Sequence, residues 1–175
     1  MDDCQKTYFY YDTNPIVSNF SANITGRLAA SVTGNTSCTP GRIVEMYSYH
    51  PAGGVTAKRL LVTNMTTVVQ DKTITYAYDT EGKVSNYTYP DGRQFEYTYD
   101  QMGRPQKLRE LWENTQGLWR DAAKNAEYNE AGQMTKLDIL TWSDESATND
   151  NYYITETRQY NFRHQSTQLA TSGIT

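Results

Sequence analysis

Short runs of alternating apolar and polar residues cover most of the chain, and a period of two is typical of β-strands. The pattern is clearest from Thr75 to Leu108. Asp79 to Gly82 and Asp100 to Gly103 interrupt it with hairpin-turn residues, because Asp bonds the backbone two residues on and Gly tolerates a positive φ. Pro90-Asp91-Gly92 is a further turn signal. The pattern therefore predicts an all-β protein, an antiparallel up-and-down meander of hairpins.

One phrase recurs within this pattern, Tyr-x-Tyr-Asp-x-x-Gly followed by Lys or Arg, at Tyr76 to Lys83 and again at Tyr97 to Arg104. We predict one β-sheet domain over residues 1–175, with about five to six repeats and one hairpin per repeat. The resulting long twisted sheet must curl into a barrel or shell segment, or cover its edges. The turn residues predicted to set the register are Tyr11, Asp12, Tyr49, Tyr78, Asp79, Gly82, Tyr99, Asp100, Gly103, Tyr128, Asn129 and Gly132.

Several stretches depart from the regular phrase. Thr13 to Ile24 forms an insertion in the first turn. Two strands are expected at 55–63 and 66–69, with a break at Gln70 to Lys72. Asp121 to Glu127 favours a helix by composition, but we expect a strand because tertiary pairing overrides weak local preference.

Two turns lack the usual residues. His50 stands where Asp is expected, and the last copy begins at Tyr160-Asn161 with Gln165 or Ser166 where Gly is expected. Ser143 to Asn151 is expected to be an acidic polar loop.

Composition and charge narrow the function classes. The 15 tyrosines favour strands, so we expect a thin, Tyr-rich sheet with a large polar face. The net charge of -4 comes from interspersed acids and bases, which gives no basic stripe for nucleic acid. The sequence has no apolar run long enough to span a membrane and no N-terminal signal peptide.

These phrases resemble the tyrosine-aspartate (YD) repeats of the Rhs family, most clearly at Tyr76 to Leu108 and Tyr128 to Leu137, and less clearly at Tyr49 to Val55 and Tyr160 to Leu169. That family includes bacterial Rhs polymorphic toxins, cocoon-forming components of insecticidal toxin complexes, and animal teneurins. The resemblance implies a spiralling β-sheet that winds into a hollow shell, which in bacteria encloses a cytotoxic cargo. It also implies that this chain is an interior slice of a secreted or cell-surface parent protein, with flanking YD repeats as partners.

Three functions are compatible with the sequence. The leading hypothesis is a non-enzymatic structural segment of such a shell, which needs no cofactor or metal. The second is a carbohydrate- or protein-binding module, because exposed tyrosines on a polar sheet suit glycans. The third is a small hydrolase around His50 or His164. Open sheet edges also predict self-association.

The candidate site residues have structural interpretations as well. His50 and His164 suit proton transfer or a metal only if folding brings them together, and are otherwise turn substitutions. Cys4 as a nucleophile with His50 as its base has no supporting motif. The repeat aspartates are explained by their turns.

Two further features depend on the compartment. Cys4 and Cys38 are the two cysteines, and both a disulfide and a pair of free buried thiols fit the sequence. Five asparagines lie in Asn-x-Ser/Thr sequons, which matter only in a secretory pathway that glycosylates: Asn19, Asn23, Asn35, Asn64 and Asn86.

Overall fold

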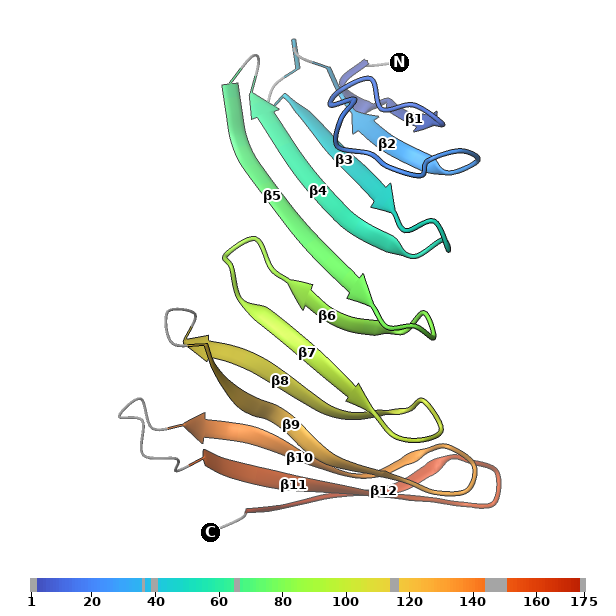
Figure 1. Cartoon of the computed structure of the whole chain (residues 1–175), viewed down its shortest axis with the longest axis vertical. Coiled ribbons are helices and arrows are strands. Elements are labelled where there is room, and N and C mark those ends of the chain that lie inside the picture. Colours follow the sequence, from blue (N-terminus) through green and yellow to red (C-terminus); the bar gives the residue numbers. More distant parts are fainter. Residues whose placement is uncertain are drawn as a thin grey trace. The chain divides into compact units, whose positions relative to one another are not determined.

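The computed structural model describes residues 3–35, 37–38, 41–64, 67–113, 117–143 and 151–173. The loop predicted from Ser143 to Asn151 has residues 144–150 outside this part of the chain. The chain divides into two compact units, Met1–Gly92 and Arg93–Thr175. Each unit is a run of strands in chain order (Figure 1).

Both units are built from antiparallel hairpins. The first unit contains a short 3-10 helix, η1 (Asp3–Gln5), and strands β1 (Thr7–Tyr11), β2 (Leu28–Thr33), β3 (Arg42–Tyr49), β4 (Val55–Asn64), β5 (Thr67–Tyr78) and β6 (Val84–Thr88). The second contains β7 (Gln94–Tyr99), β8 (Pro105–Glu113), β9 (Leu118–Tyr128), β10 (Met134–Ser143), β11 (Asn151–Tyr160) and β12 (Ser166–Gly173). Consecutive strands within a unit pair antiparallel, which confirms the predicted all-β meander.

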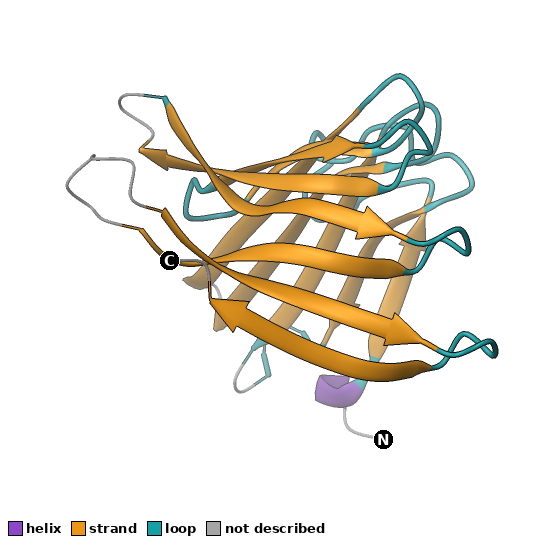
Figure 2. Ribbon diagram, turned by 90° about the horizontal axis from the view of Figure 1, so that it is seen from below, coloured by secondary structure: helices purple, strands orange, loops and turns teal. Residues whose placement is uncertain are grey.

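Neither unit closes into a barrel. Among the described strands, β1 pairs only with β2 and β12 pairs only with β11. The turns that carry the Tyr-Asp phrase or its variants lie at one end of the strands within each unit (Figure 2). In the first unit, the connection between β2 and β3 lies at the opposite end, as an up-and-down meander requires. Open strands at the sides are a feature of a sheet that a further hairpin can extend.

The insertion in the first turn packs against the hydrophobic core of the first unit. That core cluster comes from β2, β3 and β4 and consists of Ala30, Val32, Val44, Met46 and Leu61. Ile16, Val17 and Phe20 of the insertion are partly buried against it. Asn14, 5% exposed, organises the insertion. Its Oδ1 accepts from the N–H groups of Ile16 and Val17, both at 3.0 Å, and its Nδ2 donates to Ser21 Oγ at 2.9 Å.

The strand break predicted at Gln70 to Lys72 is wrong, because β5 runs unbroken from Thr67 to Tyr78. This polar stretch pairs along β4, with Lys72 opposite Leu60 and Gln70 opposite Val62. Arg59 Nε and Nη2 donate to the two carboxylate oxygens of Asp71 at 2.7 and 2.6 Å. Cross-strand pairing therefore holds as a strand a segment whose composition predicted a break. The strand expected across 121–127 is confirmed within β9.

Cys4 and Cys38 form a disulfide, which settles the alternative left open by the sequence. Cys38 is 2% exposed and follows β2, whereas Cys4 lies in η1 just before β1. The bond therefore ties the start of β1 to the segment after its partner strand.

Candidate functional site at the tyrosine–aspartate turns

The turn after β5 shows what the phrase does in atomic terms. Asp79 N–H donates to Lys83 O at 2.8 Å, and Gly82 N–H donates to Asp79 O at 3.1 Å. Asp79 Oδ1 accepts from the N–H groups of Glu81 and Lys83 at 2.9 and 2.8 Å. Gly82 has φ 82°, which glycine adopts without strain. Asp100, Asn129 and Asn161 make the same set of contacts in their own turns.

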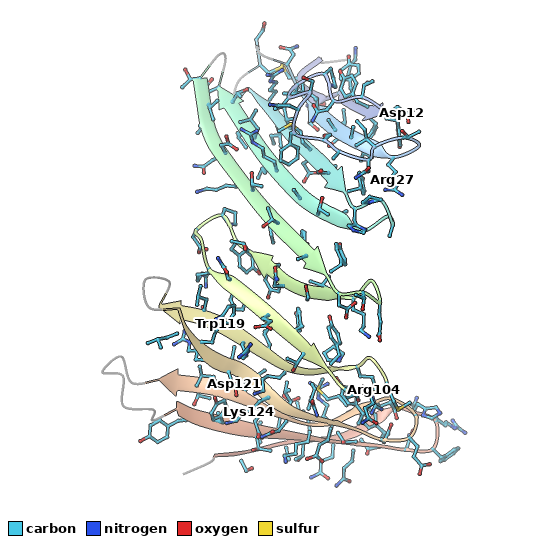
Figure 3. The ribbon with its side chains drawn as sticks, viewed as in Figure 1. Asp12, Arg27, Arg104, Trp119, Asp121 and Lys124 are labelled. Carbon is cyan, nitrogen blue, oxygen red and sulfur yellow. A yellow bond between two sulfur atoms is a disulfide. The ribbon has the colours of Figure 1, made fainter. Side chains whose placement is uncertain are left out.

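The first turn keeps this closure across its insertion. Asp12 N–H donates to Arg27 O at 3.2 Å, and Gly26 N–H donates to Asp12 Oδ1 at 2.5 Å. Asp12 itself has a φ of 62°. Figure 3 shows Asp12 and Arg27 together at the turn end of β1 and β2.

His50 takes the place of the turn aspartate. Its N–H donates to Gly54 O at 2.7 Å, and Gly53 N–H donates to His50 O at 2.8 Å. The imidazole Nδ1 lies 3.2 Å from the N–H of Ala52 and accepts from it, as Asp79 Oδ1 accepts from Glu81. The acceptor role at Nδ1 requires a neutral imidazole with its proton on Nε2.

His164, and neither Gln165 nor Ser166, stands at the glycine position of the last turn. Its φ is 61°, and its N–H donates to Asn161 O at 2.9 Å, as Gly82 does to Asp79. His50 belongs to the first unit and His164 to the second. In the described residues, neither imidazole hydrogen bonds a serine, threonine or cysteine side chain.

The proposed role of Cys4 as a nucleophile needs correction. Its sulfur is bonded to Cys38, so there is no thiol to deprotonate. Among the described residues, no group of three or more His, Cys, Asp or Glu side chains is placed to hold a metal ion. No helix there is long and apolar enough to cross a membrane.

The phrase tyrosines join each hairpin to the one before it. In four cases the tyrosine ends one strand, and its hydroxyl donates to the carbonyl oxygen of the first residue of the strand before it. The pairs are Tyr49 to Leu28 O at 2.8 Å, Tyr78 to Val55 O at 2.8 Å, Tyr128 to Pro105 O at 2.5 Å and Tyr160 to Met134 O at 2.9 Å. We call this series the tyrosine ladder. The sequence indicated packing by these tyrosines, but not this bond.

Tyr11 and Tyr99 are the other two phrase tyrosines. Tyr11 ends β1 at the open edge of the first unit, is 57% exposed, and has no hydrogen bond from its hydroxyl in the described residues. Tyr99 ends β7 opposite Pro105, with its ring 6.1 Å from that of Tyr97.

Arginines after the turn glycine reach the next tyrosine. The guanidinium of Arg27 lies 5.3 Å from the Tyr49 ring centre, and that of Arg104 lies 4.5 Å from the Tyr128 ring centre. Burial raises the pKa of both phenols, and the nearby arginine opposes that rise. Arg104 also donates from Nε to Asp100 Oδ2 at 2.7 Å. Each arginine thus links two consecutive turns.

Asp138 is a buried carboxylate that sequence reasoning missed. It is 3% exposed, and it accepts from Asn125 Nδ2 and Thr155 Oγ1, both at 2.7 Å. Burial alone would raise its pKa, but these hydrogen bonds and the charges of Lys136 and Lys124 bring the pKa below its usual value. The Asp138 carboxylate therefore stays ionised within β10 and fixes its two neighbouring strands.

Comparison with known families matches the model described as RHS Repeat to residues 78–110, which include the Asp79 and Asp100 turns. This match places an RHS repeat within residues 78–110 of the chain. Comparison with curated proteins finds no match.

Solved structures share the fold of this chain. A crystal structure of TcdB2-TccC3-Cdc42 has a TM-score of 0.58 and 12% identity over 95% of this chain. The Tc holotoxin pore of Photorhabdus luminescens with a TccC3-D651A mutation has a TM-score of 0.57 and 12% identity over 94% of this chain. The chain spans 9% of the length of each of these relatives.

Removing one ladder hydroxyl tests what it contributes. Tyr49→Phe is expected to lower the free energy of unfolding by about 1–2 kcal/mol, because the partly buried Leu28 carbonyl loses its donor. Tyr11→Phe is the matched control and is expected to change stability by less than about 0.5 kcal/mol. Urea unfolding of the two variants measures both changes in the free energy of unfolding. Equal losses would show that the ladder bond contributes nothing.

Proposed function

We propose that this chain is a structural segment of a hollow YD-repeat shell that encloses a toxin cargo in the parent protein. The observation that carries the proposal is the tyrosine ladder, because one contact repeats between successive hairpins and extends the sheet one hairpin at a time. The fold shared with the toxin-complex structures supports it, as does the resemblance to YD-repeat shells. Addition of like units is the way repeat proteins grow.

The partners in this proposal are flanking YD repeats of the same parent. Among the described strands, β1 and β12 each pair on one side only, so a further hairpin fits on the other side, and the same edges allow copies of an isolated segment to associate. We infer that the parent is secreted or displayed on a cell surface. The Cys4–Cys38 disulfide supports this, since disulfides persist in oxidising compartments.

The test uses the natural reading frame around this segment. We expect repeats on both sides, a hollow particle in electron cryomicroscopy, and a non-repeat domain inside it that resists protease. Gly41→Ala, which disrupts the first unit sterically, is expected to expose that domain, while Gly82→Ala is expected to leave it protected. A natural product that ends near Thr175, or a non-repeat domain cleaved as fast in the parent as alone, would refute the proposal.

A second candidate is binding of glycans or proteins through β1. Tyr8, Phe9 and Tyr11 are 49%, 60% and 57% exposed, and aromatic faces of this kind stack on sugars. Calorimetry against a broad glycan set should give heat that disappears in a Tyr8→Ser, Tyr11→Ser double variant. If the unaltered chain gives no heat with any glycan, the hypothesis of glycan binding is rejected.

A further inference from the structure

The residue after the left-handed turn position connects consecutive turns in three hairpins. Arg27 lies over the ring of Tyr49, and Arg104 lies over the ring of Tyr128. Gln133 donates from Nε2 to the carbonyl of His164 at 2.9 Å. In each case a long side chain fills the space between one turn and the next.

The second hairpin has Gly54 at this position, so it supplies no side chain to the third turn. A Cβ built on Gly54 would lie 2.6 Å from Tyr78 Cζ, a distance that such atoms do not adopt. A groove of about 380 Å³ remains between the two turns, and His50, Tyr78, Asp79 and Thr80 line it.

A carboxylate and an aromatic ring line the groove, and these are the two kinds of group that Arg104 contacts. Arg104 takes the carboxylate from its own turn and the ring from the next hairpin, whereas Asp79 and Tyr78 come from one hairpin. Asp79 uses Oδ1 for its turn, and Oδ2 accepts no hydrogen bond in the described residues. The equivalent Oδ2 of Asp100 accepts from Arg104.

The Tyr78 ring has no cation over it in the part of the chain that the structure describes. It lies 6.4 Å from the His50 ring, between centroids. Burial raises the pKa of the Tyr78 phenol and Tyr76 adds to the rise, with no arginine opposing it as at Tyr49. Arg27 donates to the carbonyl of His50 but is held over Tyr49 and is not among the residues that line the groove.

We propose that this groove binds an arginine side chain of a partner polypeptide, with the guanidinium over the Tyr78 ring and an N–H donated to Asp79 Oδ2. Guanidinium is favoured over ammonium because it is planar, stacks on aromatic rings and offers N–H groups in a fixed fork. Arg27 and Arg104 each lie over the ring of a phrase tyrosine in this way. This binding site goes beyond the shell role and does not depend on it.

The test is an NMR titration of the full chain with N-acetyl-arginine amide, with the His50 and Tyr78 resonances as the readout. The neutral isostere N-acetyl-citrulline amide is the control ligand. We expect saturable shifts with the arginine compound and at least about tenfold weaker binding of the citrulline compound, because its neutral group loses the charge-assisted contact. Equal binding of the two compounds, or no shift at either residue, would overturn the proposal.

Two variants locate the site. Asp79→Asn is expected to weaken arginine binding about tenfold while the turn persists, because Asn129 and Asn161 make the same turn contacts in this chain. Asp100→Asn is the matched control and is expected to leave binding unchanged, since Arg104 already occupies that carboxylate. Unchanged binding in Asp79→Asn, or an equal loss in both variants, counts against the groove.

Discussion

Gly41→Ala is expected to unfold the first unit, with a loss of free energy of unfolding above about 4 kcal/mol. Gly41 has φ 114°, and a Cβ there would lie 1.7 Å from Thr63 O and 2.7 Å from Thr63 C. These are backbone atoms of β4, and Thr63 pairs with Arg42, the residue after Gly41. The overlap can therefore be relieved only by separating β3 from β4.

The control separates steric overlap from the cost of the backbone conformation. Gly82 also has a positive φ, 82°, but a Cβ there meets nothing within 4 Å. Gly82→Ala is thus expected to lower the free energy of unfolding by only about 1–2 kcal/mol. Hydrogen exchange followed by mass spectrometry reports residues 1–92 separately from 93–175. Similar protection of residues 1–92 in the two variants would contradict the steric argument.

Reduction of the Cys4–Cys38 disulfide is expected to lower the free energy of unfolding of the first unit by about 3–4 kcal/mol. The bond closes a loop with a sequence separation of 34, so breaking it restores considerable freedom to the unfolded chain. The second unit contains neither of the chain's two cysteines and is expected to keep its stability.

A double variant, Cys4→Ser with Cys38→Ser, distinguishes loss of the bond from effects of the reductant. Its thermal unfolding without reductant should match that of the reduced protein, and added reductant should leave the variant unchanged. If the oxidised and reduced proteins unfold at the same temperature, the disulfide does not stabilise the unit.

Much of the fold could be read from the sequence because its signals are local. The Asp79 and Asp100 turns depend on hydrogen bonds between residues at most four apart, and those residues carry their chemistry in the sequence. The alternation between turns then requires strands that reverse direction. The strand across 121–127 was predicted against its composition on a different ground, because tertiary pairing overrides a weak local preference.

The errors fall where the deciding contact is not local. Gln70 to Lys72 have the composition of a break, and their pairing with β4 keeps them in β5. His164 takes the glycine position because its φ of 61° is set by the turn around it, which the letter sequence does not show. Asp138 is buried through donors on β9 and β11, which no pattern within β10 reveals.

The sequence by itself determined the repeat, the hairpin turns and the all-β meander, since each follows from bonds within a few residues and from side-chain alternation. Only the tertiary structure decided that Tyr49 and Tyr78 bond the preceding hairpin, that Cys4 pairs with Cys38, and that Gly54 leaves a groove beside Asp79. The physical reason is distance along the chain. These contacts join residues far apart in sequence, so they exist only after the strands have chosen their neighbours.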